Sequence, residues 1–246
     1  MQPLLSHRHR YPSLGVPERQ PQGPVELLPY GPTYLFWPPQ NTVLGRAAVP
    51  IFTALRPPVK LGSNGAFWDF QDTTGGAGNR RVGLRMNRSA QYESTWEVLL
   101  KWRNTGVTPN IAAIMSASPD AATNPKDHTL GINATGGPTY AVWDGSATRE
   151  AALAGPLHAD GEIVHLVATS RFNFVTVYTN GVERGKTGSA SPGEFYTPAF
   201  LVLGGAAAAN FNCEIYYAAW YDRQLSPAEI GARAADPYGR LVRPMF

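Results

Sequence analysis

Residues 161–169 read GEIVHLVAT and residues 175–181 read VTVYTNG, and these two neighbouring runs decide the fold. Beyond its first two residues, the first run is apolar except for His165 and the final threonine, which is typical of a central β-strand. The second run alternates in polarity and ends in Asn180-Gly181, the strongest short signal for a β-hairpin. The two runs together predict a central strand followed by a hairpin.

Similar strand patterns extend outward in both directions along the chain. In residues 96–103 large apolar side chains alternate with Glu97, Lys101 and Arg103. This period of two predicts a half-buried strand whose charged side chains point away from the core. Residues 200–204 and 211–221 predict two more strands. Many short strands separated by turn signals are typical of a sandwich or a barrel.

One short helix is predicted near the end of the chain. Ser226 suits the N-cap, Pro227 the first helical position and Glu229 the third, which together form a capping box. The helix should run to about Ala235, because Asp236-Pro237 then interrupts it. We expect it to pack on the edge of the sandwich.

The composition excludes several classes of protein. The 246 residues include 25 Gly and 22 Pro, and only 16% are charged. Gly and Pro interrupt too many windows for a mainly helical protein, and the aromatic content is too high for a disordered one. No window approaches 18 apolar residues, so we expect no membrane insertion. The single Cys213 excludes a disulfide framework and a cysteine-based zinc site.

Residues 1–60 differ from residues 61–246, and we expect the domain boundary between them. The first segment holds 12 of the 22 prolines and carries six basic and two acidic residues, whereas the second carries 15 and 16. A nearly neutral body argues against nucleic acid as a partner. The prolines favour an extended arm that docks on its own body or on neighbouring subunits. Its large apolar residues are the candidate assembly anchors, namely Tyr30, Tyr34, Leu35, Phe36, Trp37, Ile51 and Phe52.

The residues now quoted resemble the laminin-G-like / concanavalin A-like lectin–glucanase superfamily. Members typically read G-x-W-x-H-V-A-x-T, then a strand ending in Y-x-N-G, then an L-x-I/L-G strand. Residues 161–169, 175–181 and 201–204 match these segments, with Ile163 in place of the tryptophan. The family's later F-x-G-x-I and Y-N-R-x-L-S-x-x-E-I segments are matched by residues 211–215 and 221–230, with Cys213 in place of the glycine. The resemblance implies an all-β fold: a two-sheet, antiparallel, jelly-roll-type β-sandwich with one short C-terminal helix and an extended N-terminal arm.

Catalysis is not expected. The glucanase branch of this family carries an E-x-D-x-x-E segment, which this sequence lacks. Glu93 and Glu97 have the spacing of a pair on one strand face, as a retaining glycosidase requires, but we interpret them as exposed glutamates on a solvated face. His165 is interpreted as a hydrogen-bonded core histidine. No catalytic residue, metal ligand or cofactor is assigned, and a weakly held calcium ion is the one cofactor left open.

Carbohydrate binding remains an alternative. Sugar sites combine aromatic platforms with a few polar groups. Trp143 and Asp144 are the best candidates, followed by Trp68 and Asp69, although each tryptophan would equally suit the core.

The leading hypothesis is a non-enzymatic structural protein of a virion. Residues 235–241 resemble the tail that follows the capping-box helix in laminin-G-like proteins of tailed bacteriophages. This implies a tail, baseplate, fibre or capsid decoration component, with other virion proteins and copies of itself as partners. Residues 1–10 hold no apolar signal region, so we expect synthesis in the host cytoplasm and a final location in the virion. A glycan-binding adhesin that recognises a host glycan is second, and a glycoside hydrolase is a distant third.

Overall fold

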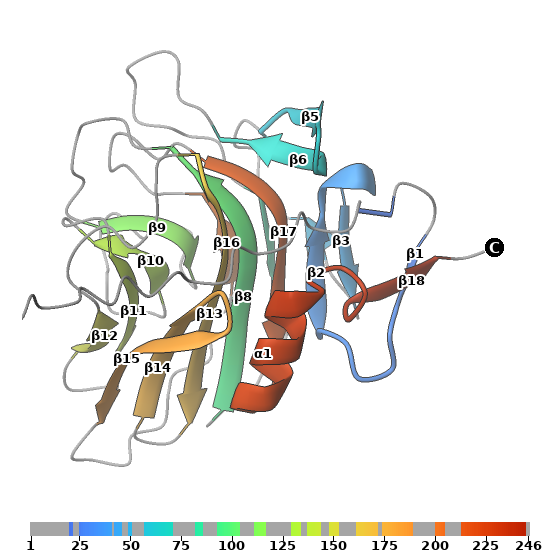
Figure 1. Ribbon diagram of the computed structural model, residues 1–246. Coiled ribbons are helices and arrows are strands. Elements are labelled where there is room, and N and C mark those ends of the chain that lie inside the picture. Colours follow the sequence, from blue (N-terminus) through green and yellow to red (C-terminus); the bar gives the residue numbers. More distant parts are fainter. Residues whose placement is uncertain are drawn as a thin grey trace, which may run out of the picture.

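The computed structural model is a β-sandwich with one short helix among the residues it describes (Figure 1). The described residues are 20–21, 25–40, 42–45, 49–50, 57–70, 82–85, 93–103, 111–116, 129–133, 137–143, 148–152, 161–171, 174–188, 200–204 and 213–244. The mostly β, antiparallel architecture predicted from the sequence is confirmed. None of the helices in this described part has the length and apolar character needed to cross a membrane.

The larger sheet forms the centre of the molecule. Its strand order is β15 (Val182–Gly188), β14 (Phe174–Thr179), β13 (Ile163–Arg171), β8 (Glu93–Trp102), β17 (Cys213–Tyr221), β2 (Tyr34–Trp37) and β3 (Thr42–Gly45). A hairpin of β5 (Val59–Gly62) and β6 (Gly65–Asp69) also pairs with β17. The 3₁₀ turn η1 (Pro38–Gln40) connects β2 to β3.

The second sheet packs against one face of the first. Its order is β12 (Thr148–Ala152), β11 (Pro138–Trp143), β10 (Thr129–Asn133), β9 (Ile111–Ser116), β16 (Phe200–Leu203), β7 (Val82–Arg85) and β4 (Val49–Pro50). A separate two-stranded sheet joins β1 (Val25–Leu27) to β18 (Val242–Pro244), so the two ends of the described chain are paired.

The hairpin and central strand predicted from residues 161–181 are confirmed. β13 lies between β14 and β8 in the sheet. Asn180 and Gly181 form the two-residue turn between β14 and β15, with φ angles of 50° and 79°. Both residues therefore occupy the left-handed region that a type I′ turn requires.

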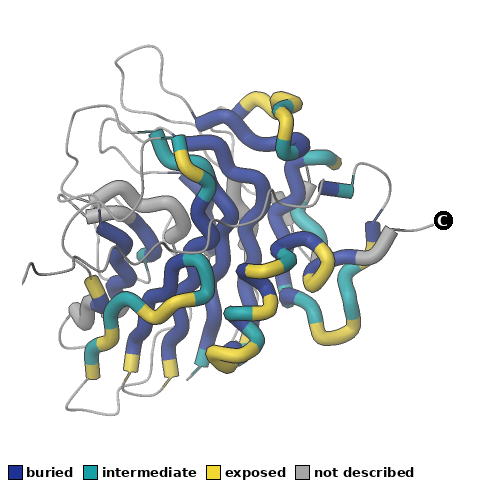
Figure 2. The backbone as a smooth tube through the Cα atoms, viewed as in Figure 1, coloured by how far each residue is buried: buried dark blue, intermediate teal, exposed yellow. Residues whose placement is uncertain are grey.

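Two apolar clusters lie on opposite faces of the large sheet. The first lies between the two sheets and contains Trp96 and Val98 of β8 together with Tyr140 and Leu201 of the second sheet. The second covers the other face and contains Leu99 of β8 and side chains from the helix and the C-terminal tail. β8 is consequently buried on both faces (Figure 2), and the expectation that it is half-buried was wrong.

Helix α1 (Pro227–Ala235) covers the middle of the large sheet rather than its edge (Figure 1). Ile230 is fully buried in the second cluster, and the side chain of Arg233 reaches the buried Glu97 of β8. The predicted capping box is confirmed: Ser226 Oγ accepts from the Glu229 backbone, and Glu229 accepts from the Ser226 backbone. The position of α1 over the middle of the large sheet corrects the expectation of a helix at the edge of the sandwich.

Part of residues 1–60 belongs to the sandwich itself. β2 pairs with β17, and β5 runs through residues 59–62, across the expected boundary. Gln20 is buried, and its Nε2 donates to the carbonyl of Tyr216 at 2.7 Å. At these described positions the N-terminal segment docks on its own body, which is one of the two alternatives that the sequence left open.

Candidate functional site

A groove of about 500 Å³ lies beside helix α1, and it is the candidate functional site. Four segments build it: the turn at residues 28–31, the connection between β17 and α1, the helix α1 itself, and the turn at residues 238–241. Its lining consists of Leu28, Pro29, Tyr30, Arg223, Ala228, Glu229, Ala232, Arg233 and Arg240. Its volume lies in the range of small-molecule sites.

The first turn presents an aromatic ring to solvent. Gly31 N donates to the Leu28 carbonyl at 2.8 Å, with Pro29 and Tyr30 at the two central positions. Pro29 favours this turn because its φ is fixed near the required value. A Cβ on Gly31 would lie 2.9 Å from the Leu28 carbonyl oxygen, so the close turn needs glycine. Tyr30 is therefore 87% exposed, and it is one of the residues that line the groove.

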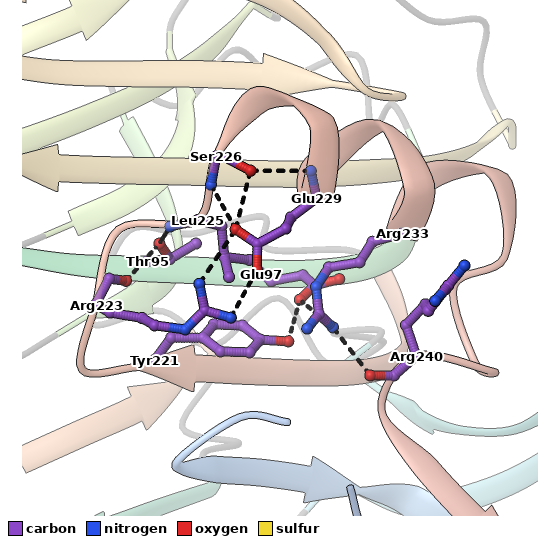
Figure 3. A network of polar contacts seen from close by, with 9 residues as sticks. All are labelled: Thr95, Glu97, Tyr221, Arg223, Leu225, Ser226, Glu229, Arg233 and Arg240. Carbon is purple, nitrogen blue, oxygen red and sulfur yellow. Dashed lines mark hydrogen bonds and ion pairs between the residues drawn. The ribbon is translucent and has the colours of Figure 1, made fainter. Parts of the chain in front are cut away.

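The second turn, which lies next to the first, holds Arg240. Gly239 N donates to Asp236 Oδ1 at 3.0 Å, and Leu241 N donates to the Tyr238 carbonyl at 3.1 Å. The Arg240 carbonyl accepts from Arg233 at 3.3 Å. Figure 3 shows the side chain of Arg240 directed away from the network around Glu97.

Glu229 lies in the groove, but its carboxylate is fully engaged. It accepts two hydrogen bonds from Arg223, at 2.7 and 3.1 Å, and others from the backbone and hydroxyl of Ser226. The hydrogen bonds from Arg223 lower the pKa of Glu229 to about 2, against the smaller effect of burial. At neutral pH this group holds no proton that it could donate to a leaving group.

Beneath the groove, Glu97 lies at the centre of a buried polar network (Figure 3). His165 Nε2 donates to Oε1 at 2.7 Å, Tyr217 donates to Oε1 at 2.9 Å and Tyr221 donates to Oε2 at 2.5 Å. Arg233 Nη1 lies 3.7 Å from Oε2. Burial alone would raise the pKa of Glu97, but the hydrogen bond and charge of His165 and the charge of Arg233 lower it overall. The carboxylate is therefore ionised and compensated inside the protein.

This arrangement corrects the interpretation of Glu97 as an exposed glutamate. Glu97 has no exposed surface, whereas Glu93 is partly exposed and pairs with Arg171 at 3.0 Å. A glycosidase needs two carboxylates flanking a bond that the substrate can place between them. Glu97 and Glu93 do not provide this, because a substrate cannot reach Glu97. His165 is fully buried and its Nε2 bonds Glu97, as expected of a core histidine, but its Nδ1 has no hydrogen-bond partner among the described residues.

The amino-acid sequence also supports the β-sandwich fold described above. A family model described as the concanavalin A-like lectin/glucanases superfamily matches residues 66–231, which is more than half of the chain. The chain belongs to this superfamily. A comparison with curated proteins gives no significant match.

Solved structures of this superfamily fold share the architecture. The binding domain of botulinum neurotoxin serotype G matches with a TM-score of 0.65 and 8% identity, over 83% of this chain and 50% of that one. The serotype D binding domain gives 0.63 and 13%, over 83% and 50%. The binding domain of neurotoxin DC in complex with SialylT gives 0.60 and 10%, over 83% and 51%. This chain thus spans about half the length of these domains, and such low identity shows the fold alone.

Two of the residues predicted as sugar ligands are not available at the surface. Trp68 is fully buried in the core of the superfamily fold, where it packs edge-to-face against Phe36 with ring centroids 6.5 Å apart. Asp69 is buried and pairs with Lys60 at 2.5 Å. Both were wrong as candidates for a surface sugar site. Trp143 ends β11, but its side chain and Asp144 lie outside what the structure describes, so both stay predictions.

The predicted assembly anchors separate into three groups. Tyr34, Leu35, Phe36 and Trp37 are buried in the chain's own core, so they are not available to hold a neighbouring subunit. Tyr30 is exposed at the groove. Ile51 and Phe52 lie outside the described residues.

Within the described residues, no group of three or more His, Cys, Asp or Glu side chains could hold a metal ion.

The sequence analysis did not identify the arginines of the groove as candidate site residues. The superfamily match ends at residue 231, so it includes neither the turn of Tyr30 nor that of Arg240. The one local signal was Pro29-Tyr30-Gly31, which predicts a turn with an exposed aromatic residue. The approach of Arg240 to this turn depends on pairing between β1 and β18.

Proposed function

We propose that this chain is a non-catalytic carbohydrate-binding module. The observation that carries the proposal is the groove, in which the exposed ring of Tyr30 borders a surface that also contains arginine side chains. Sugar sites on proteins combine such an aromatic surface with a small number of polar groups that fix orientation. The lectin-like fold supports this function but does not by itself establish it.

The groove favours binding over hydrolysis. Glycoside hydrolysis requires an acid whose pKa is raised and a second carboxylate that faces the substrate. Glu229 has a pKa of about 2 and is engaged by Arg223, while Glu97 lies buried below. Neither side chain suits the role of general acid.

Two structural neighbours support the choice of ligand class. One neurotoxin binding domain was solved in complex with SialylT. For neurotoxin type C, cell entry depends on interaction with two ganglioside molecules. Both statements concern the neurotoxins. For this chain they favour glycans as the first ligands to test.

A glycan array with the full chain tests the proposal. We expect binding to a subset of glycans, with no release of reducing sugar when the same glycans are incubated with the protein. The array is run with calcium and with a chelator, because a weakly held calcium ion stays part of the prediction. A blank array under both conditions would contradict glycan binding, and turnover of a bound glycan would contradict a non-catalytic role.

We propose as a second function that the module is a structural component of a tailed-bacteriophage virion. The observation that favours assembly is strand β5, which pairs with β6 and exposes Val59 and Leu61, the latter by 77%. An exposed apolar strand of this kind suits strand addition by a neighbouring subunit. Other virion proteins and copies of this chain are the proposed partners, after synthesis in the host cytoplasm.

Location tests this second function. We expect the chain to co-purify with particles at a fixed copy number, and Leu61→Asp to lower that number because it places a charge in the contact. Val182→Asp, which places the same charge at an exposed apolar residue of β15, is the control for a general change in surface charge. Absence of the chain from purified particles would refute the virion role and leave glycan binding untouched.

A further inference from the structure

The charges of the groove identify a class of ligand. Three arginines and one glutamate line it, but two of the arginines already have partners. Arg223 is held by Glu229, and Arg233 lies near Glu97 and donates to the Arg240 carbonyl. Arg240 contributes a positive charge at the exposed turn, and that charge makes the groove complementary to an anion.

The geometry points to a sugar that carries a carboxylate, with Arg240 as the partner of the carboxylate and Tyr30 as the platform for the ring. This inference rests on the proposed glycan-binding function and names its ligand class and site. A guanidinium is planar and binds a carboxylate through two parallel hydrogen bonds, which fixes the orientation of the sugar. The apolar side of the sugar ring then lies against the aromatic face.

The walls of the groove favour a sugar over an acidic peptide. Extended peptides commonly bind by pairing with the edge of a sheet. Here the walls are a helix and two turns whose backbone groups are engaged, by the bonds from Gly31 N to Leu28 and from Leu241 N to Tyr238. Ala228 and Ala232 give the helical wall a small, flat surface suited to a ring. An acidic peptide is therefore the competing ligand that the test must exclude.

The two residues that carry the inference lie outside the part of the chain that the family model matches. The family model matches residues 66–231, whereas Tyr30 and Arg240 lie on opposite sides of that range. The two residues come together because Leu28 N donates to the Leu241 carbonyl at 3.3 Å, next to the pairing of β1 with β18.

The experiment measures binding of the full chain to polysialic acid, a polyuronate, neutral dextran and poly-glutamate by biolayer interferometry. We expect binding to the two acidic glycans that weakens with added salt, and weaker binding to dextran and poly-glutamate. Arg240→Gln should weaken acidic-glycan binding by at least about tenfold, since a charge-assisted hydrogen bond is lost. Tyr30→Ser should weaken it similarly, whereas Tyr30→Phe keeps the ring and should retain most of the affinity.

Lys186→Gln is the matched control, because it removes one exposed positive charge on β15 outside the groove. Thermal unfolding of each variant confirms that the fold is retained. Unchanged affinity in Arg240→Gln, or equal binding of dextran, would overturn the inference while leaving glycan binding intact. Poly-glutamate bound as tightly as the polyuronate, and lost equally in Arg240→Gln, would overturn the assignment to a sugar. If no glycan binds the unmodified chain, the proposed function itself fails.

Discussion

Glu97 is a buried carboxylate whose neighbours determine its effect on stability. Burying an ion costs several kcal/mol, which its partners must offset. His165, Tyr217 and Tyr221 donate hydrogen bonds to it, and Arg233 supplies an opposite charge while packing over the ring of Tyr221 at 4.8 Å. The network joins the large sheet to helix α1. Its members depend on the Glu97 carboxylate as a hydrogen-bond acceptor or as a counterion.

Glu97→Gln should lower the free energy of unfolding by about 3–5 kcal/mol, because it leaves the buried guanidinium of Arg233 without its counterion. Urea denaturation at pH 7 measures the change. Glu93→Gln is the matched control on the same strand, where the pair with Arg171 is partly exposed and the expected loss is below about 1 kcal/mol. Equal losses in the two variants would contradict the larger effect that we expect from the buried network.

Glu229 makes the stability of the fold depend on pH. Its pKa is about 2 in the folded chain against 4.5 ordinarily, so its ionised form is favoured by folding. That contribution is fully present above about pH 4.5 and is lost as the pH falls through 2. The unmodified chain should be more stable than Glu229→Gln at pH 7, and the difference should shrink as the pH falls towards 2. Urea midpoints at a series of pH values test this, and a difference independent of pH would contradict it.

Among the elements, the close contact between α1 and the β14–β15 hairpin requires glycine at Gly181 but not at Gly231. Gly181 has a φ of 79°, and a Cβ there would lie 3.1 Å from the Ala234 Cβ and 3.2 Å from the Gly231 Cα. A Cβ on Gly231 would meet nothing within 4 Å. The close approach therefore needs a glycine in the hairpin but not in the helix.

The same substitution should have opposite effects at these two positions. Gly181→Ala should destabilise by about 1–2 kcal/mol, through the left-handed backbone and the crowding against α1. Gly231→Ala should stabilise by about 0.5–1 kcal/mol, because alanine favours a helix interior. Thermal melts of both variants measure the changes. A loss of stability in Gly231→Ala would contradict the open space beside the helix.

At the scale of the whole molecule, the N-terminal segment is part of the sandwich. Residues 34–37 form β2, which covers one side of β17, and their side chains are buried. Removing them would expose the core and the backbone groups of β17 to solvent. Residues 34–37 thus have a structural role within the chain, which is independent of any role of the residues that precede them.

Two truncations separate these roles. Deletion of residues 1–60 should prevent stable folding, because β1, β2 and β3 are lost together with Gln20. Deletion of residues 1–19 retains all of these and should leave the melting temperature close to that of the full chain. Circular dichroism and thermal melts compare the two. A truncation from residue 61 that melts as cooperatively as the full chain would refute this view of the sandwich.

Much of the fold could be predicted because it depends on local patterns. The Asn180-Gly181 turn and the Ser226–Glu229 capping box are local, since each is completed by residues a few positions apart. The depth of burial was not predictable in the same way. Glu97 alternates with the apolar residues beside it, and this alternation predicts the face of the strand on which it lies. It does not predict what covers that face. A helix 130 residues further along the chain covers it.

Sequence patterns specify the strands, the hairpin, the helix and the superfamily, because their signals are periodic or contained in short motifs. The candidate site depends on the tertiary structure. Tyr30 and Arg240 border one groove only because the first and last described strands pair and α1 lies beside them. Such a contact depends on the path of the whole chain, and no local pattern near residue 30 specifies what lies next to it. The fold is therefore determined by local physical preferences, and the groove by the packing of distant segments.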